Sequence, residues 1–155
     1  MKYELVKSSR DDIDRLIEYK KRNIYEYAND LSKEEIYKIN SYVTSEVPKL
    51  ISNYCNIIVD DKIIGCLLLT DKDNGILLDE IYIEEEYRNK GIGTSVIKDV
   101  ISKNKIIYLW VYKDNFTFDD EVIENSLNVV DEISKKINID EFEIYFGQLI
   151  MKHYL

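Results

Sequence analysis

The stretch that decides the fold is Asp79-Glu80-Ile81-Tyr82-Ile83-Glu84-Glu85-Glu86-Tyr87-Arg88-Asn89-Lys90-Gly91-Ile92-Gly93-Thr94. It predicts the end of an apolar strand, a short loop with the spacing Arg-x-x-Gly-x-Gly, and the start of a helix. The unpaired N–H groups and the dipole at a helix start attract anions, and glycine lets a phosphate approach the backbone closely. Arg88 and Lys90 can add positive charge. The pattern therefore favours a binding site for a diphosphate.

Two other interpretations of this loop stay open. Its glycines could serve only the backbone geometry of a tight turn between a strand and a helix. The loop also resembles the dinucleotide fingerprint Gly-x-Gly-x-x-Gly, for which Asp114 lies at a suitable distance. However, Val96 replaces the third glycine, and antiparallel strands precede the loop. A dinucleotide-dependent oxidoreductase is therefore disfavoured.

The residues before this stretch predict a strand, two helices and three further strands. The helix-start patterns are Ser9-x-x-Asp12 and Ser32-x-x-Glu35, and Pro48 is expected to end or kink the second helix. Turns are predicted at Asp60-Asp61 and Asn74-Gly75, so the last three strands should be antiparallel. The predicted strands are Tyr3–Lys7, Asn56–Val59, Lys62–Thr70 and Ile76–Glu84.

The residues after it predict a helix over Gly91–Lys103 and a strand over Ile106–Tyr112, whose continuous apolar run is typical of a buried strand. A strand, a helix and a strand in close succession form a βαβ unit, so the two strands should be parallel. A further helix over Asp119–Ile137 and strands over Phe142–Phe146 and Leu149–Tyr154 follow. The predicted fold class is α+β, with a mixed, mostly antiparallel sheet and helices on both faces.

Composition limits the function classes. The 155 residues, 45% hydrophobic and 33% charged, are expected to form one globular domain spanning 1–155. A net charge of −9 argues against nucleic acid as a partner. The absence of a long apolar run or a signal-peptide pattern predicts a cytoplasmic protein without a membrane partner. Cys55 and Cys66 lack the spacing of a metal or redox site, and His153 is expected at the surface.

Arg88-x-x-Gly91-x-Gly93, the lead-in Glu80-Ile81-Tyr82-Ile83-x-x-x-Tyr87 and the order of elements resemble the GNAT superfamily of N-acetyltransferases. The resemblance covers essentially the whole chain. It implies a central splay between the fourth and fifth strands, Ile76–Glu84 and Ile106–Tyr112, in which acetyl-CoA is bound as co-substrate without a metal. The implied cofactor-binding residues are Ile81, Tyr82, Ile83, Arg88, Asn89, Lys90, Gly91, Ile92, Gly93, Thr94 and Asn115.

The resemblance also implies direct transfer of an acetyl group to a primary amine on a small molecule or peptide. An amide N–H near Ile83 would stabilise the oxyanion of the tetrahedral intermediate. The amine must lose a proton, and Glu80 is the first candidate base and Asp79 the second. Because side chains alternate along a strand, only one of these two is expected to face the substrate. A homodimer is compatible with the resemblance, since members of the family often dimerise.

The chain departs from the family after the fifth strand. Of the frequent pattern Asn-x-x-Ala-x-x-x-Tyr, only Asn115 is matched, and Val122 stands where the tyrosine would protonate the leaving thiolate. Tyr112, Tyr145 or water stay open as proton donors, so no general acid is assigned. The alternative function is a non-catalytic acyl-CoA-binding or regulatory module.

Overall fold

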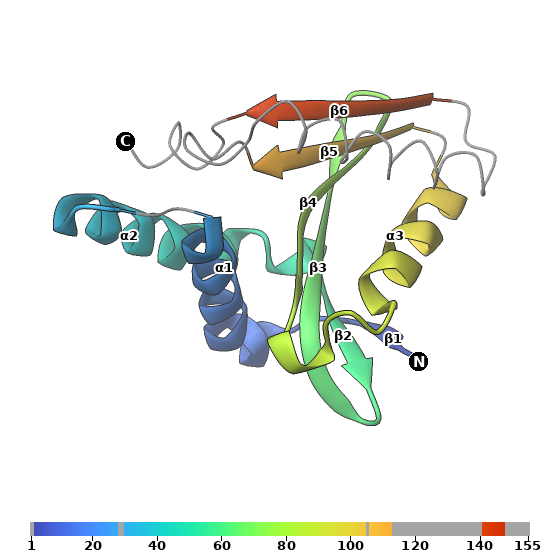
Figure 1. Ribbon diagram of the computed structural model, residues 1–155, viewed down its shortest axis with the longest axis horizontal. Coiled ribbons are helices and arrows are strands. Elements are labelled where there is room, and N and C mark those ends of the chain that lie inside the picture. Colours follow the sequence, from blue (N-terminus) through green and yellow to red (C-terminus); the bar gives the residue numbers. More distant parts are fainter. Residues whose placement is uncertain (1, 28–29, 105, 113–140, 148–155) are drawn as a thin grey trace.

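A computed structural model describes residues 2–27, 30–104, 106–112 and 141–147 (Figure 1). Their strands form one sheet in the order β1-β2-β3-β4-β5-β6. The first four pair antiparallel, and β4 with β5 and β5 with β6 pair parallel. The strands are β1 (Glu4–Lys7), β2 (Tyr54–Val59), β3 (Lys62–Lys72), β4 (Gly75–Ile83), β5 (Ile106–Tyr112) and β6 (Glu141–Gly147). The predicted parallel arrangement of the βαβ strands is confirmed.

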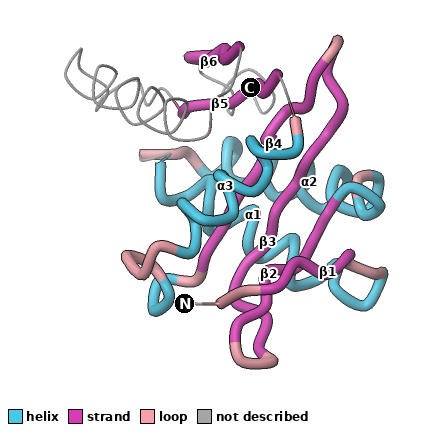
Figure 2. The backbone as a smooth tube through the Cα atoms, turned by 90° about the vertical axis from the view of Figure 1, so that its right-hand side faces the viewer, coloured by secondary structure: helices cyan, strands magenta, loops and turns pink. Residues whose placement is uncertain are grey.

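Helices cover both faces of the sheet, as predicted. The helices are α1 (Ile13–Tyr27), α2 (Lys33–Lys49) and α3 (Ile92–Lys103). Apolar side chains of α1 and α2, including Leu16 and Val43, pack on one face in a cluster with Tyr54. Val96 and Val100 of α3 pack in a second cluster on the opposite face. Figure 2 views the sheet from the α3 side, with α1 and α2 behind it.

Local signals fixed most element boundaries. Ser32 caps α2 by accepting a hydrogen bond at 3.1 Å from the N–H of Glu35, and α2 ends one residue after Pro48. Ser9 begins a single 3-10 turn, Arg10–Asp12, before α1. Asp60 and Asp61 both have positive φ values, 49° and 62°, as expected for a tight hairpin turn.

The second hairpin differs from the prediction by one residue. Gly75 already pairs with Lys72 in the ladder, so the turn residues are Asp73 and Asn74 rather than Asn74 and Gly75. Asp73 adopts the left-handed conformation with a φ of 48°. Aspartate tolerates this region better than most residues, so the glycine is not required in the turn itself.

The sheet opens between β4 and β5, which confirms the expected splay (Figure 1). Only Ile76–Leu78 of β4 pair with β5, opposite Ile107–Leu109. In the ladder with β3, Leu68 pairs with Glu80 and Leu69 with Leu78, so Asp79 is an extra residue on β4. This β-bulge lies where the pairing with β5 stops. Because a bulge bends its strand and increases the local twist, it accounts for the divergence of β4 from β5.

Several predicted features lie outside the described residues. They are Asp114, Asn115 and Val122, the helix Asp119–Ile137, the strand Leu149–Tyr154 and His153. The described β6 covers the predicted strand Phe142–Phe146 with one more residue at each end.

Candidate functional site

The loop between β4 and α3 has the backbone geometry that glycine makes accessible. Gly91 has a φ of 81°, and its C=O accepts a hydrogen bond at 3.0 Å from the N–H of Ser95. It is therefore the N-cap of α3, and the N–H groups of the first helical turn, from Ile92 to Thr94, have no carbonyl partner within the helix. A Cβ built on Gly91 would meet no described atom within 4 Å. The glycine thus satisfies backbone geometry and also borders open space.

A cavity of about 370 Å³ lies against this loop, the end of β4 and one face of α1. Ile83 forms part of its wall, and its Cδ1 is 3.3 Å from the position of a Cβ on Gly93. The lining residues are Asn23, Glu26, Ile81, Tyr82, Ile83, Tyr87, Arg88, Asn89, Gly91, Ile92, Gly93, Thr94 and Ile97. The loop and strand residues singled out in the sequence come together here.

The residues that line the cavity differ in two ways from the cofactor-binding residues expected from the sequence. Lys90 does not line the cavity, and its ammonium lies 5.5 Å from the centre of the Tyr87 ring. Asn23 and Glu26 do line it, although no sequence motif indicates them. They lie three residues apart on α1 and so share one face of the helix. That spacing is the only local signal, because the contact of α1 with the loop arises from tertiary packing.

The free edge of β4 presents backbone groups to the gap. The N–H of Glu84 donates at 2.8 Å to the C=O of Ile64 in β3. Since backbone groups of successive strand residues point to opposite edges, those of Ile81 and Ile83 point away from β3. Pairing with β5 has already ended at Leu78. The C=O of Ile83 already accepts a hydrogen bond from Arg88, so an extended ligand with amide groups could hydrogen-bond to the N–H of Ile83 and to the backbone groups of Ile81.

Glycine is also needed in β3, directly behind this edge. A Cβ on Gly65 would lie 2.1 Å from the carbonyl oxygen of Tyr82. This close approach of two backbones excludes any side chain at position 65 unless β4 moves.

The side chain of Arg88 contacts three other residues of the site. Its Nε donates at 2.7 Å to the C=O of Ile83, and its Nη2 lies 2.7 Å from Oε1 of Glu26 on α1. The guanidinium carbon lies 5.3 Å from the centre of the Tyr82 ring. The structure thus directs much of the Arg88 side chain to protein groups and fixes the loop against the strand and helix.

The candidate base Glu80 lies in a buried polar cluster. Its side chain is 2% exposed, and Oε2 accepts a hydrogen bond at 2.7 Å from the hydroxyl of Tyr54. The Nζ of Lys20 lies 3.4 Å from the same oxygen, and the Sγ of Cys66 lies 3.9 Å from Oε1. Burial and the neighbouring carboxylate raise the pKa values of Tyr54 and Cys66, so both stay protonated. Cys66 is a free, buried thiol, and Cys55 is free and half-buried.

Lys20 stays charged in this cluster. Burial lowers the pKa of Lys20, but the attraction of Glu80 and Asp79 outweighs it, so the pKa is raised overall. The register of β4 against β3 shifts at Asp79, so the regular alternation of side chains is interrupted at this position. The expectation that only one of the two candidate bases faces the substrate depends on that alternation. Asp79 is half-buried and Glu80 is buried.

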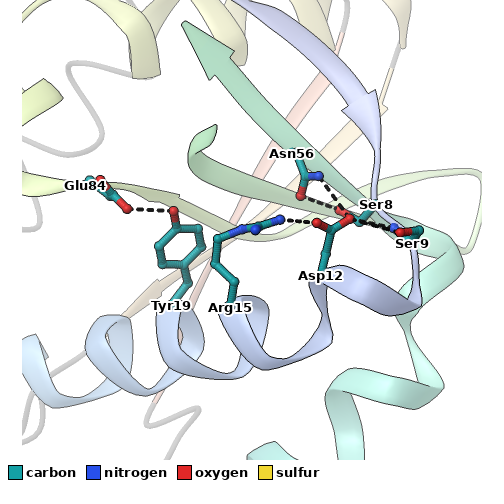
Figure 3. A network of polar contacts seen from close by, with 7 residues as sticks. All are labelled: Ser8, Ser9, Asp12, Arg15, Tyr19, Asn56 and Glu84. Atoms are coloured by element: carbon teal, nitrogen blue, oxygen red, sulfur yellow. Dashed lines mark hydrogen bonds and ion pairs between the residues drawn. The ribbon is translucent and has the colours of Figure 1, made fainter. Parts of the chain in front are cut away.

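A second set of polar contacts holds α1 beside the cavity (Figure 3). Tyr19 donates from its hydroxyl to Oε1 of Glu84 at 2.8 Å, and its ring centre lies 4.8 Å from that of Tyr82. Glu84, the last residue of the predicted strand Ile76–Glu84, is half-buried and hydrogen-bonded. Burial, followed by the contact with Glu84, raises the pKa of Tyr19. The hydrogen bond from Tyr19 therefore also holds the end of β4 against α1.

The same network continues to the start of α1. Asp12 accepts hydrogen bonds from the N–H of Ser9 at 2.7 Å and from Nδ2 of Asn56 at 3.1 Å, and it pairs with Arg15 (Figure 3). Burial opposes the ionisation of Asp12, but these contacts outweigh it and lower its pKa. The beginning of α1 is therefore anchored to β2.

Among the described residues, no group of three or more histidine, cysteine or acidic side chains could hold a metal ion. No helix in that part of the chain has the length and apolarity needed to cross a bilayer. The side chains of Tyr112 and Tyr145 lie outside the description, so neither is assigned as a proton donor.

Comparisons with known proteins identify relatives of this site and fold. The model of the acetyltransferase (GNAT) family matches residues 14–117. No curated protein matches the sequence. Among solved structures, apo-form YjaB from Escherichia coli is similar with a TM-score of 0.62 and 17% identity, covering 86% of this chain and 82% of that one.

Two further structures are similar over most of their length. PaiA N-acetyltransferase from Thermoplasma acidophilum, in complex with coenzyme A, has a TM-score of 0.54 and 23% identity, covering 84% of this chain and 89% of that one. An acetyltransferase of the GNAT family from Staphylococcus aureus Mu50 has a TM-score of 0.54 and 16% identity, with coverages of 84% and 83%. At these identities the structures support the fold.

Proposed function

Because the chain belongs to the acetyltransferase (GNAT) family, we propose that it transfers the acetyl group of acetyl-CoA directly to a primary amine. The observation that carries this proposal is the cavity between the end of β4 and the first turn of α3. It combines helix N–H groups, which suit a diphosphate, with a free strand edge, which suits an amide-containing chain. The similar PaiA enzyme was solved with coenzyme A. A cytoplasmic location and a homodimer stay predictions.

In this proposal the diphosphate binds at the N–H groups from Asn89 to Thr94. The pantetheine arm follows the open edge of β4 at Ile81 and Ile83, where backbone groups face the gap. The thioester then lies near the N–H of Ile83, which stabilises the oxyanion. Arg88, bonded to the C=O of Ile83, positions the strand end rather than serving mainly as a phosphate ligand.

The reaction replaces the C–S bond of the thioester by a C–N bond. The neutral amine attacks the carbonyl carbon, the tetrahedral intermediate expels the thiolate, and the amine proton passes to a base. A lysine-like amine with a pKa near 10.4 lies about 3.4 units above pH 7, so deprotonation costs roughly 4.6 kcal/mol. A carboxylate that accepts this proton, directly or through water, lowers the barrier.

Asp79 is the better placed of the two candidate bases. Glu80 is 2% exposed and its Oε2 contacts Tyr54 and Lys20, so a substrate amine could reach it only by displacing protein groups. Asp79 is half-buried at the bulge where the gap begins. We therefore assign proton acceptance to Asp79 and a positioning role to Glu80. Asp79→Asn should lower kcat beyond any loss of stability caused by the missing attraction to Lys20, whereas Glu80→Gln should mainly lower stability.

Calorimetric titration with acetyl-CoA and with CoA tests the binding step. Wild-type protein should bind both, and Gly91→Val should lose most of the affinity, because its side chain would occupy the space beside the helix N–H groups. Thiol release measured with a panel of primary amines tests the transfer. Folded protein that gives no heat with either ligand would refute the proposal. Binding without thiol release on any amine would support the non-catalytic acyl-CoA-binding alternative.

A further inference from the structure

Glu26 places a negative charge in the wall of a cavity that we assign to an anion. It comes from α1 and lines the same cavity as the first turn of α3, from Gly91 to Thr94. A carboxylate there repels a diphosphate, and the repulsion is only partly screened because the side chain is 36% exposed. The charge of Glu26 therefore opposes the binding of a diphosphate, for which the helix N–H groups are suited.

The partner of Glu26 is the cation that could otherwise contribute most to anion binding. Nη2 of Arg88 lies 2.7 Å from Oε1 of Glu26, while Nε is bonded to the C=O of Ile83. A guanidinium can bind a carboxylate or a phosphate through its planar fork, but one nitrogen cannot serve both equally well at once. Glu26 thus competes with the ligand for the charge of Arg88.

We propose that Glu26 sets the affinity of the acetyl-CoA site by repelling the diphosphate and by holding Arg88. This inference rests on the proposed binding of acetyl-CoA in the cavity. CoA and acetyl-CoA carry the same diphosphate, so an interaction with the diphosphate that tightens the binding of one also tightens the binding of the other. A site of limited affinity lets the CoA product leave after each turnover, a step that often limits kcat.

Calorimetric titration of Glu26→Gln with CoA tests the inference. The substitution keeps the size of the side chain and removes its charge. The Kd for CoA should fall by roughly three- to tenfold, as expected for charges interacting across a partly hydrated site. The affinity should also become more sensitive to salt, because a negative charge that opposes the phosphates is removed from the cavity wall. Glu26→Ala should change the Kd in the same direction.

Two controls separate a local effect from a general one. Glu18→Gln removes the same charge from α1 at a 56% exposed side chain that is 3.2 Å from Arg22. It should leave the Kd for CoA unchanged. Pantetheine, which lacks the diphosphate, should bind wild type and Glu26→Gln equally.

Each result has a defined meaning. Wild type that binds CoA while Glu26→Gln binds it no more tightly would overturn this inference and leave the proposed function intact. Equal tightening by Glu18→Gln, or equal tightening of pantetheine, would also overturn it. Failure of the folded wild type to bind CoA at all would overturn both.

Discussion

Substitution of Lys20 by methionine should reveal how strongly the buried cluster at Glu80 depends on its cation. Lys20 is 15% exposed and Glu80 2% exposed on their side chains, with Nζ and Oε2 3.4 Å apart. Removing one partner of a buried ion pair costs about 3–5 kcal/mol, because the other charge stays buried without compensation. The remaining hydrogen bond from Tyr54 to Glu80 places the expected loss at the lower end, about 3 kcal/mol.

This loss is large enough to measure by urea unfolding at equilibrium. A domain of this kind has a free energy of unfolding of about 5–15 kcal/mol, so the variant should fold but unfold at clearly lower urea concentration.

A matched substitution at the surface provides the control. Lys38→Met removes an ammonium that lies 3.3 Å from Glu34, in a pair whose side chains are 45% and 78% exposed. Exposed pairs of this type contribute about 0.3–0.5 kcal/mol, so this variant should remain close to wild type. If Lys20→Met loses no more stability than Lys38→Met, the account of the cluster is wrong.

Three further predictions concern the elements around the cavity. Gly65→Ala should lower the free energy of unfolding and weaken CoA binding, since its Cβ would lie 2.1 Å from the carbonyl oxygen of Tyr82; an alanine variant as stable as wild type would contradict the tight backbone contact. Tyr19→Phe should cost about 0.5–1.5 kcal/mol in urea unfolding, because it removes the hydrogen bond to Glu84 and keeps the ring contact with Tyr82. The pKa of Asp12 is lowered in the folded state from its ordinary value of 3.8, so its stabilising effect is present above that value and disappears as the pH falls through the folded-state pKa. Asp12→Asn should therefore flatten the acid side of the stability profile, and an unchanged profile would contradict the assigned contacts.

The sequence carried enough information to predict the described helices and strands and the loop between β4 and α3. The turn Asp60-Asp61, the cap at Ser32 and the glycine spacing at Gly91 and Gly93 act through neighbours within a few residues. The strand Ile106–Tyr112 was recognised with the observed bounds, because a continuous apolar run differs clearly from its surroundings. Local physics and hydrophobic pattern agree in these places.

Features that depend on distant partners could not be predicted from the sequence. The bulge at Asp79 is a property of the register between β3 and β4, and it interrupts the side-chain alternation that the strand pattern predicts there. Lys20 meets Glu80, and Glu26 meets Arg88, only because α1 packs against the end of β4. A charged residue on an isolated helix gives no indication of which distant charge it will contact.

The divergence of β4 from β5 also has a consequence for handling the protein. Past Leu78, β4 has an edge in the interior of the sheet, with the backbone groups of Ile81 and Ile83 directed outward from β3. Edges of this kind can recruit a strand from another molecule, which is a common start of aggregation. A small molecule that lies along this edge would protect it, so we expect concentrated protein to stay monodisperse longer when CoA is included in the buffer.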